Sequence, residues 1–464
     1  MEKYIEDGHV HDGHRGRMRA KLASHGHRIF DTYEILEMLL YQVVPYRDTN
    51  PVAKNLLRAF GSLDGVLSAS VSELSGVCGI GEKTAEYLSD VGRISEILGA
   101  ELQGGVSEFA DYEKVGKYLV DYFSGVKGNQ VVALFLDSSM RLIRTTKMYD
   151  LEYESGGVKA RPFIDEAMAT HASVVITAHN HPFGPFYPSE GDKATQTVIT
   201  DALSLAGLVH AEHYIISGRD FAGIGSLDHF AAKLKQMPAV SEFIDTRERY
   251  ESKPNGVESV KPNESLSGRR DYRNHSFLAK LISYSTEQGD RLAVLLLDRY
   301  GSIENIFTAP LRELELMVGQ QKIALYLKLL AYTCSRRVTD EFAFGKQHNL
   351  AEIADYLKGL FIGESVEKIY LITFDKSNNV TDCILLGEGT VNASEVMPRK
   401  AVEAAISAKA ASVAIAHNHP FGIPEPSSDD INMTSLFDTL FNNCEIALKE
   451  HFIVAGQLCD TVIS

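Results

Sequence analysis

The sequence has few cysteines and no paired cysteine motif. Five cysteines occur among 464 residues, and no two of them form a Cys-x-x-Cys pair. A sparse, odd set of this kind argues against a disulfide framework and against a thiolate metal site. We therefore expect a protein of a reducing compartment, with a cytoplasmic location.

Long apolar runs are also missing. No stretch of about 18 apolar residues occurs, so we expect no membrane span. The segment Met1–Asp7 lacks the apolar core of a signal peptide. With 44% hydrophobic and 23% charged residues, the composition is that of a soluble globular protein, and the length allows several domains.

The chain has fewer positively charged residues than negatively charged ones. The chain has 46 Lys and Arg residues against 62 Asp and Glu residues, a net charge of −16. Neutralising nucleic-acid phosphates requires concentrated Lys and Arg, so an extended nucleic-acid-binding surface is disfavoured. A local basic patch is not excluded by the total.

One short stretch occurs twice. The sequence His-Asn-His-Pro-Phe-Gly fills 179–184 and again 417–422. In each copy seven residues separate the second His from a Ser, and two more separate that Ser from an Asp. The stretches 60–63 and 300–303 resemble each other at nearly the same offset along the chain. A nearly constant offset indicates a tandem duplication of one whole unit.

The repeated stretch has the residue types of a metal site. Residues i and i+2 of a strand point to the same side, so each copy presents two imidazoles together. The proline that follows ends the strand, and the loop brings the Asp to the start of a helix. Two His and one carboxylate with an open fourth position form a catalytic zinc set. The predicted ligands of up to two Zn²⁺ ions are His179, His181 and Asp192 in the first copy and His417, His419 and Asp430 in the second.

The residues around these ligands allow hydrolytic chemistry. A zinc ion in such a site lowers the pKa of its bound water to about 7 and polarises a carbonyl. Ser189 and Ser427 could then hydrogen-bond the tetrahedral oxyanion. A structural alternative is that Ser-x-x-Asp is a helix capping box. Capping explains the Ser and the Asp but not the His pair, so we favour a metal.

A helical region precedes the first copy. Residues 28–100 read as helices, and Gly79–Ala85 forms a Gly-x-Gly turn that opens a new helix. Such a turn exposes backbone N–H groups at a positive helix end, as in the DNA-backbone-binding helix-hairpin-helix module that it resembles. This predicts DNA contacts by Gly79, Gly81 and Lys83, although a tight turn that needs glycine explains the same pattern. The second helical region has Val-Gly-Gln at 318–320, so we expect it to be structural or a dimer-like partner.

Each helical region is followed by alternating strands and helices. This order predicts a mixed sheet flanked by helices, and hence an α/β (α+β) protein. A polar segment with few apolar residues separates the units and reads as a flexible linker. The expected domains are a helical domain 1–105, an α/β domain 106–235, a linker 236–272, a degenerate helical domain 273–345 and a second α/β domain 346–464.

The spacing His-x-His-x7-Ser-x2-Asp resembles the metal signature of the JAB/MPN family of JAMM metalloproteases. The flanking sequence resembles its bacterial RadC branch, in which a helix-hairpin-helix region precedes a JAB domain. Departures from that branch are the duplication and the residues Phe183 and Phe421, where Ser is expected. The matching stretches are 14–17, 48–51, 60–63, 79–85, 389–390, 398–399 and the two His motifs.

The resemblance implies a zinc-dependent metallopeptidase or isopeptidase with a protein or peptide substrate. It also implies an upstream Glu as general base, for which Glu395 is the leading candidate and Glu388 the alternative. In the first copy only Glu152 and Glu154 stand nearby. The second reading is a protein of DNA repair or recombination whose metal sites are structural or weakly active.

A further repeated motif lies in the last part of each copy. Glu212-His213 and Glu450-His451 each enter a predicted strand. Such a His could support a metal ligand from behind or be a hydrogen-bonded core residue, and the sequence does not separate these readings.

Overall fold

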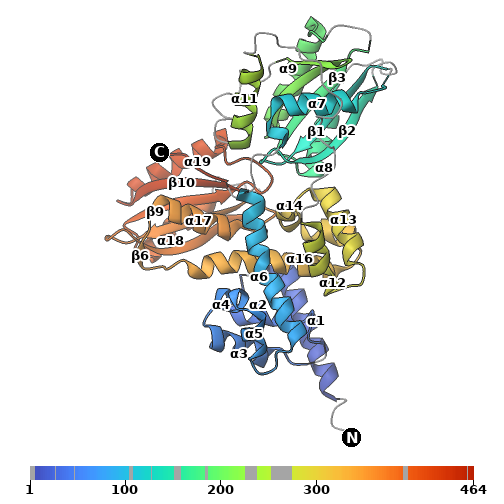
Figure 1. Ribbon diagram of the computed structural model, residues 1–464. Helices are drawn as coiled ribbons and strands as arrows, with labels where there is room; N and C mark the ends of the chain where they lie inside the picture. The colour runs from blue at the N-terminus through green and yellow to red at the C-terminus, as the bar shows by residue number, and fades with distance from the viewer. Residues whose placement is uncertain are drawn as a thin grey trace.

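The computed structural model describes residues 6–26, 28–45, 47–103, 108–126, 128–150, 158–182, 186–224, 238–251, 274–389, 396–456 and 458–463. Two α/β domains lie on different sides of a helical body, the first at the top of Figure 1 and the second at its left. Among the described residues, no helix is both long and apolar enough to cross a bilayer. The predicted fold class, with two mixed sheets and helices around them, is confirmed.

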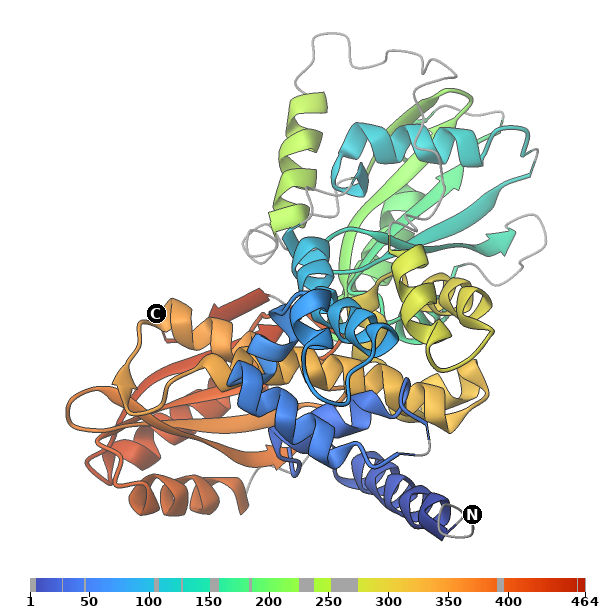
Figure 2. The same ribbon diagram turned by 60° about the horizontal axis from the view of Figure 1, so that its bottom comes forward.

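The two helical regions build a single body. Its buried side chains come from both Met18–Leu98 and Leu278–Cys334 and form one hydrophobic cluster. Figures 1 and 2 show the blue and the gold helices packed together in this body. Its helices are α1 (Glu6–His25), α2 (Thr32–Leu40), α3 (Asn50–Phe60), α4 (Leu63–Ser68), α5 (Val71–Ser75), α6 (Glu82–Gln103), α12 (His275–Ser283), α13 (Gly289–Tyr300), α14 (Ile303–Thr308), α15 (Leu311–Val318) and α16 (Gln321–Glu341).

Contacts across the body join the two copies. The ring of Tyr87 packs edge-on against Tyr284, with centroids 4.8 Å apart. Asp90 accepts hydrogen bonds from Lys280 (2.8 Å) and from the Tyr284 hydroxyl (2.7 Å). The two regions predicted as separate helical domains therefore share one core.

The same residue types at matching positions form the same turns in both helical regions. Gly61 and Gly301 end α3 and α13 with positive φ of 82° and 78°, a conformation that glycine adopts without strain. The serines that follow, Ser62 and Ser302, then cap α4 and α14 through their side-chain oxygens.

The first α/β domain has a five-stranded sheet in the order β2-β1-β3-β4-β5. β3 and β4 are parallel, and the other neighbouring strands are antiparallel. The central strand β3 is buried at every residue. The elements are η1 (Glu108–Ala110), α7 (Tyr112–Tyr122), β1 (Gln130–Leu136), β2 (Leu142–Asp150), α8 (Arg161–Thr170), β3 (Val174–Asn180), α9 (Glu190–Leu205), β4 (Val209–Ser217) and β5 (Asp220–Gly223).

The second α/β domain repeats this order and adds a short edge strand, β11-β10-β9-β7-β8-β6. Here β9 is the fully buried central strand and runs parallel to β10. The elements are β6 (Lys346–Gln347), α17 (Leu350–Phe361), β7 (Lys368–Phe374), β8 (Asn379–Glu388), α18 (Val396–Ser407), β9 (Ser412–Asn418), α19 (Ser428–Asn442), β10 (Ala447–Ala455) and β11 (Leu458–Thr461).

The predicted linker 236–272 is wrong at its beginning. Residues Pro238–Glu251 form helix α11, which packs on the first α/β domain. Val240 and Phe243 are fully buried in the core of that domain, and Arg247 pairs with the buried Glu212 at 3.2 Å. Ala239, Ile244 and Tyr250 pack beside these two residues, so one apolar side of an otherwise polar helix docks on the domain.

Candidate metal centre

The end of the central strand places the two histidines of each copy. β3 ends at Asn180, and β9 ends at Asn418. The Asn180 side chain accepts from the Gln130 backbone N–H at 2.7 Å and donates to the Gly128 carbonyl at 2.9 Å. Asn418 makes the matching pair of bonds in the second copy. The Asn between the two histidines therefore fixes the strand end, a role that sequence reasoning did not identify.

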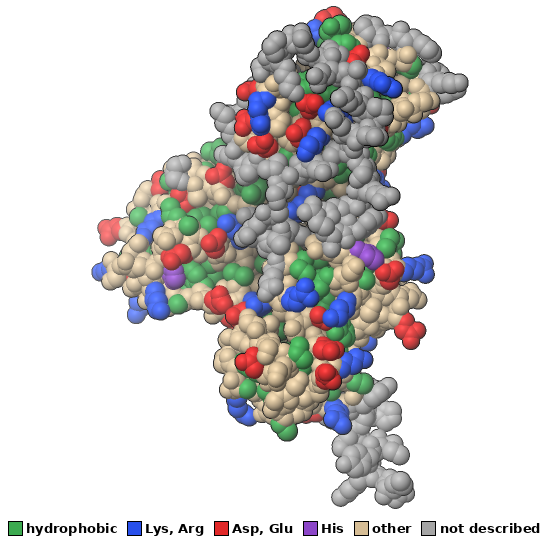
Figure 3. Space-filling view, viewed as in Figure 1, with side chains coloured by type: hydrophobic (Ala, Val, Ile, Leu, Met, Phe, Trp, Pro, Cys, Tyr) green, Lys and Arg blue, Asp and Glu red, His purple; other side chains and the backbone are tan. Residues whose placement is uncertain are grey.

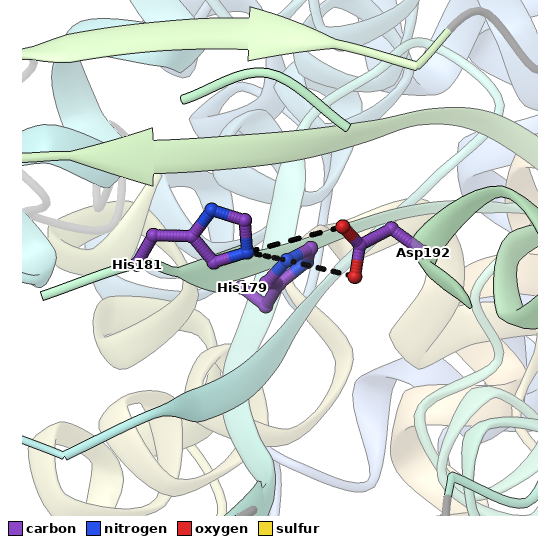
Figure 4. Close-up of side chains that lie close together, drawn as sticks. All are labelled: His179, His181 and Asp192. Carbon is purple, nitrogen blue, oxygen red and sulfur yellow. Dashed lines mark hydrogen bonds and ion pairs between the residues drawn. The ribbon is translucent and has the colours of Figure 1, made fainter. Parts of the chain in front are cut away.

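The first copy brings its three predicted ligands together (Figure 4). His179 Nε2 lies 2.9 Å from His181 Nε2 and 3.4 Å from Asp192 Oδ1. His181 Nε2 lies 3.9 Å from Asp192 Oδ2. Two imidazole nitrogens and one carboxylate thus converge on one point, which is a donor set that zinc takes in catalytic sites.

The second copy has the same arrangement, with the Asp closer to both histidines. His417 Nε2 lies 3.0 Å from His419 Nε2 and 3.1 Å from Asp430 Oδ1. His419 Nε2 lies 3.6 Å from Asp430 Oδ2. In each copy the three ligand atoms lie within 4.8 Å of one another, so each group could hold one metal ion.

Helix capping orients the aspartates. Ser189 is the N-cap of α9 and Ser427 that of α19, and each forms a capping box with the Asp three residues on. Ser427 also donates its hydroxyl proton to Asp430 Oδ2 at 2.6 Å. Capping uses Oδ2 and leaves Oδ1 next to the first His of the set. The capping box and the ligand set therefore coexist in the same residues.

Burial and hydrogen bonding tune the candidate ligands. Burial lowers the pKa of His179 to about 4, so its imidazole is neutral at physiological pH, the form that binds metals. Burial raises the pKa of Asp430, but hydrogen bonds from His417, His419 and Ser427 outweigh this effect. The pKa of Asp430 therefore lies well below its usual range, and the carboxylate is charged.

A second histidine backs the first ligand in both copies. His213 Nε2 lies 2.6 Å from His179 Nδ1, and His451 Nε2 lies 2.8 Å from His417 Nδ1. A partner on Nδ1 fixes the ring orientation and leaves Nε2 for the metal. His213 and His451 thus lie where a supporting residue is needed, and their sequence signal was the shared Glu-His pair before the last strands.

What lies behind this second histidine differs between the copies. In the first, His213 Nδ1 lies 2.7 Å from Thr177 Oγ1, which in turn lies 2.7 Å from His210 Nε2. His210 Nδ1 then lies 2.7 Å from Thr200 Oγ1. In the second copy the chain is short, because His451 Nδ1 meets Thr434 Oγ1 at 2.7 Å. Alignment of the two His motifs places Ile415 and Leu448 at the positions of Thr177 and His210.

The predicted general bases are only partly described. Glu395, Glu152 and Glu154 lie outside the described residues. Glu388 ends β8 opposite Lys368, and its side chain is 64% exposed. Burial lowers the pKa of His419, but its bonds to Asp430 and to the Ile423 carbonyl, the charge of Asp430 and, least of all, the charge of Glu367 raise it above its usual value. The sequence reasoning missed Glu367. Alignment of the two His motifs places Asn129 at the position of Glu367 in the first copy.

A small pocket with a cavity volume of about 30 Å³ adjoins the second site. It lies between the helical body and the carboxyl ends of β9 and β10, where α/β proteins commonly bind ligands. Its wall combines side chains of α6 and α14 with the loop after α17 and with the second site itself. The lining residues are Leu98, Glu304, Phe307, Thr308, Phe361, Ile362, Gly363, Glu364, Asn418, His419, Pro420, Val454 and Gly456.

The Gly-x-Gly turn is exposed on the helical body. Gly79 has a φ of 94° and precedes α6, whose first turn carries the exposed Lys83. Gly81 is exposed, and no atom lies near the place where a Cβ would be. This leaves the backbone N–H groups at the start of α6 accessible to a ligand.

The chain matches two family models. The RadC-like JAB domain matches residues 109–228 and again 347–462, which together make up half of the chain. The SAM-like helix-hairpin-helix tandem matches residues 52–89, which include the Gly-x-Gly turn. The duplicated α/β domains and the helical hairpin thus agree with the architecture of that family.

The curated relatives align with a stretch of this chain about as long as one of its two units. A UPF0758 protein of Herminiimonas arsenicoxydans is 31% identical over 215 residues, 46% of this chain and 96% of that protein. A UPF0758 protein of Janthinobacterium sp. (strain Marseille) is 30% identical over 214 residues, again 46% of this chain and 95% of the relative. A UPF0758 protein of Fusobacterium nucleatum is 29% identical over 216 residues, 45% of this chain and 93% of the relative. The chain belongs to the RadC family, whose JAB domain, of metallohydrolase-like type, it carries twice.

Proposed function

We propose that the chain is a zinc-dependent hydrolase of the metallopeptidase or isopeptidase type, with the second α/β domain as its main active site. The observation that carries the proposal is the convergence of His417, His419 and Asp430 beside a pocket. Zinc in this site supplies a water of lowered pKa and a Lewis acid for the scissile carbonyl. The substrate is a protein or peptide that reaches the pocket, and the five unpaired cysteines support a cytoplasmic location.

The protein's own residues hold the reacting groups in place. His451 orients His417, and the Ser427 cap orients Asp430. Ser427 donates its proton to Asp430 Oδ2, so it serves an oxyanion only after this bond is released. Ser189 has the equivalent capping position in the first copy.

A carboxylate must accept the proton of the attacking water. Glu395 is the base proposed from the family pattern, and Glu367 is added because it precedes Lys368, whose backbone N–H donates to Asn418 between the two His ligands. Neither position has a Glu in the first copy, since alignment of the two His motifs gives Gly157 and Asn129 there. The first site therefore binds zinc and turns over slowly, if at all.

The test is hydrolysis of peptide and isopeptide substrates by protein with measured zinc content. Glu395→Gln and Glu367→Gln should show which of the two residues is the base. The variant that lacks the base should lose at least about 100-fold in kcat and still bind zinc. Glu388→Gln tests the alternative base, and Glu403→Gln, at an exposed carboxylate on α18 of the same domain, is the matched control. The proposal fails if fully zinc-loaded protein hydrolyses no amide substrate.

A second function, DNA binding through the helical body, is favoured by the exposed Gly-x-Gly turn and the matching hairpin model. The Lys and Arg side chains on the face shown in Figure 3 are interspersed with Asp and Glu, so the contact would be local. Lys83→Ala should weaken binding to nicked or branched DNA and lower the salt slope by about 1. Lys322→Ala, in the first turn of α16, is the matched control because Lys322 corresponds to Lys83 in the second helical region. Equal effects of both changes, or no binding, would remove this function.

A further inference from the structure

Phe421 joins the loop of the second metal site to the first α/β domain. Its ring stacks on His171, with centroids 4.0 Å apart and planes at 22°. The Ser173 hydroxyl donates to the Phe421 carbonyl at 3.2 Å. His171 also stacks on Tyr300 of the helical body, and its Nε2 lies 3.2 Å from Glu313. The loop is thus tied to a residue that the helical body holds.

Ile423 carries this contact to a metal ligand. Its side chain packs against the hydrophobic core of the first α/β domain. Its backbone carbonyl lies 2.7 Å from His419 Nδ1. A carbonyl only accepts, so His419 donates from Nδ1 and presents Nε2 toward His417 and Asp430. The position of Ile423 on the first domain therefore determines how His419 is oriented.

The second α/β domain has the same turn as the first, but not the groups that receive Phe421. His171 follows α8 with a φ of 55°, and Lys409 follows α18 with a φ of 52°. The ring of His171 is largely covered, whereas Lys409 is exposed. Ala411 stands at the position of Ser173, so the second domain lacks both groups that receive Phe421.

We propose that the first α/β domain is a positioning element for the second metal site, with Phe421 and Ile423 as the positioning residues that hold His419. This gives a role to Phe421, one of the two phenylalanines that stand where the resemblance predicts serine; Phe183 lies outside the described residues. The proposal rests on the zinc site of the proposed function but not on hydrolysis, so it stands if zinc binds and no substrate is cleaved.

The experiment measures the zinc affinity of each site by chelator competition. His179→Ala leaves only the second site, and His417→Ala leaves only the first. In the His179→Ala protein, Phe421→Ser should weaken zinc binding about 10- to 100-fold, the usual cost of losing support behind a ligand. Phe421→Tyr keeps the ring and should stay within about threefold of the parent.

Matched controls separate positioning from general damage. Phe421→Ser in the His417→Ala protein should leave the first site's affinity unchanged, and Phe183→Ser in the His179→Ala protein should leave the second unchanged. His171→Ala alone should weaken zinc binding at the second site. In the Phe421→Ser protein it should have little further effect, because both substitutions remove the same contact. A second-site affinity that stays within twofold of the parent in Phe421→Ser, with the thermal midpoint preserved, would overturn the proposal.

Discussion

The two α/β domains carry the same ligands in different surroundings. Around the first site, a buried polar chain runs from His213 to Thr200, and α11 packs on the domain from outside. Around the second site, apolar Ile415 replaces part of that chain, and a pocket forms against the helical body. The comparison shows that duplication kept the groups that could bind a metal and altered the residues around them.

The helical regions give a second comparison. They share one core, yet the first keeps an exposed Gly-x-Gly turn before α6, whereas Gly319 and Gln320 precede α16. We infer that any DNA contact belongs to the first region, while the second contributes Phe307 and Thr308 to the pocket of the metal site.

The largest expected difference is in hydrolysis. His417→Ala should lower kcat/KM at least about 100-fold, or about 2.7 kcal/mol of activation free energy. His179→Ala should change it by less than about threefold, because the first site lacks a Glu at either proposed base position. Steady-state kinetics on one peptide substrate measures both. Equal losses in the two variants would break the assignment of activity to the second domain.

The next prediction concerns the histidines that lie behind the metal ligands. His213→Phe and His451→Phe should each weaken zinc binding at their own site by about 10- to 100-fold. The control for each variant is the other site of the same molecule, which should be unaffected. If neither substitution changes affinity, the contacts of His213 with His179 and of His451 with His417 serve only core packing.

The smallest difference is in stability. Thr177→Val removes the hydroxyl that lies 2.7 Å from both His210 and His213, so these buried rings lose a partner. The free energy of unfolding should fall by about 1–3 kcal/mol. At the matched position, Ile415→Val removes one methylene and should cost about 0.5–1.5 kcal/mol. Urea titration measures both, and an equal or larger loss for Ile415→Val would contradict a stabilising role for the polar chain.

The sequence predicted the parts of the site that depend on local spacing. Alternation along a strand placed His417 and His419 on one side, and the capping box placed Asp430 at the start of a helix. The offset between copies revealed the duplication, which the two family matches agree with. These predictions succeeded because a few neighbouring residues fix each of them.

The remaining features depend on contacts between distant segments. Helix α11 was read as linker because its surface is polar, and its docking depends on Val240, Phe243 and an ion pair to Glu212. The shared helical core joins segments that lie far apart in the chain, which no local pattern reveals. Phe421 was visible only as a departure from the family pattern, since its partner His171 belongs to the other α/β domain.

The most direct test of the account is the zinc content of three purified proteins. The intact chain should bind two zinc ions, and His179→Ala and His417→Ala should each bind one, because each ligand set is complete within its own domain. A chain that binds no zinc, or one in which a single substitution removes both ions, would contradict the existence of two independent metal sites.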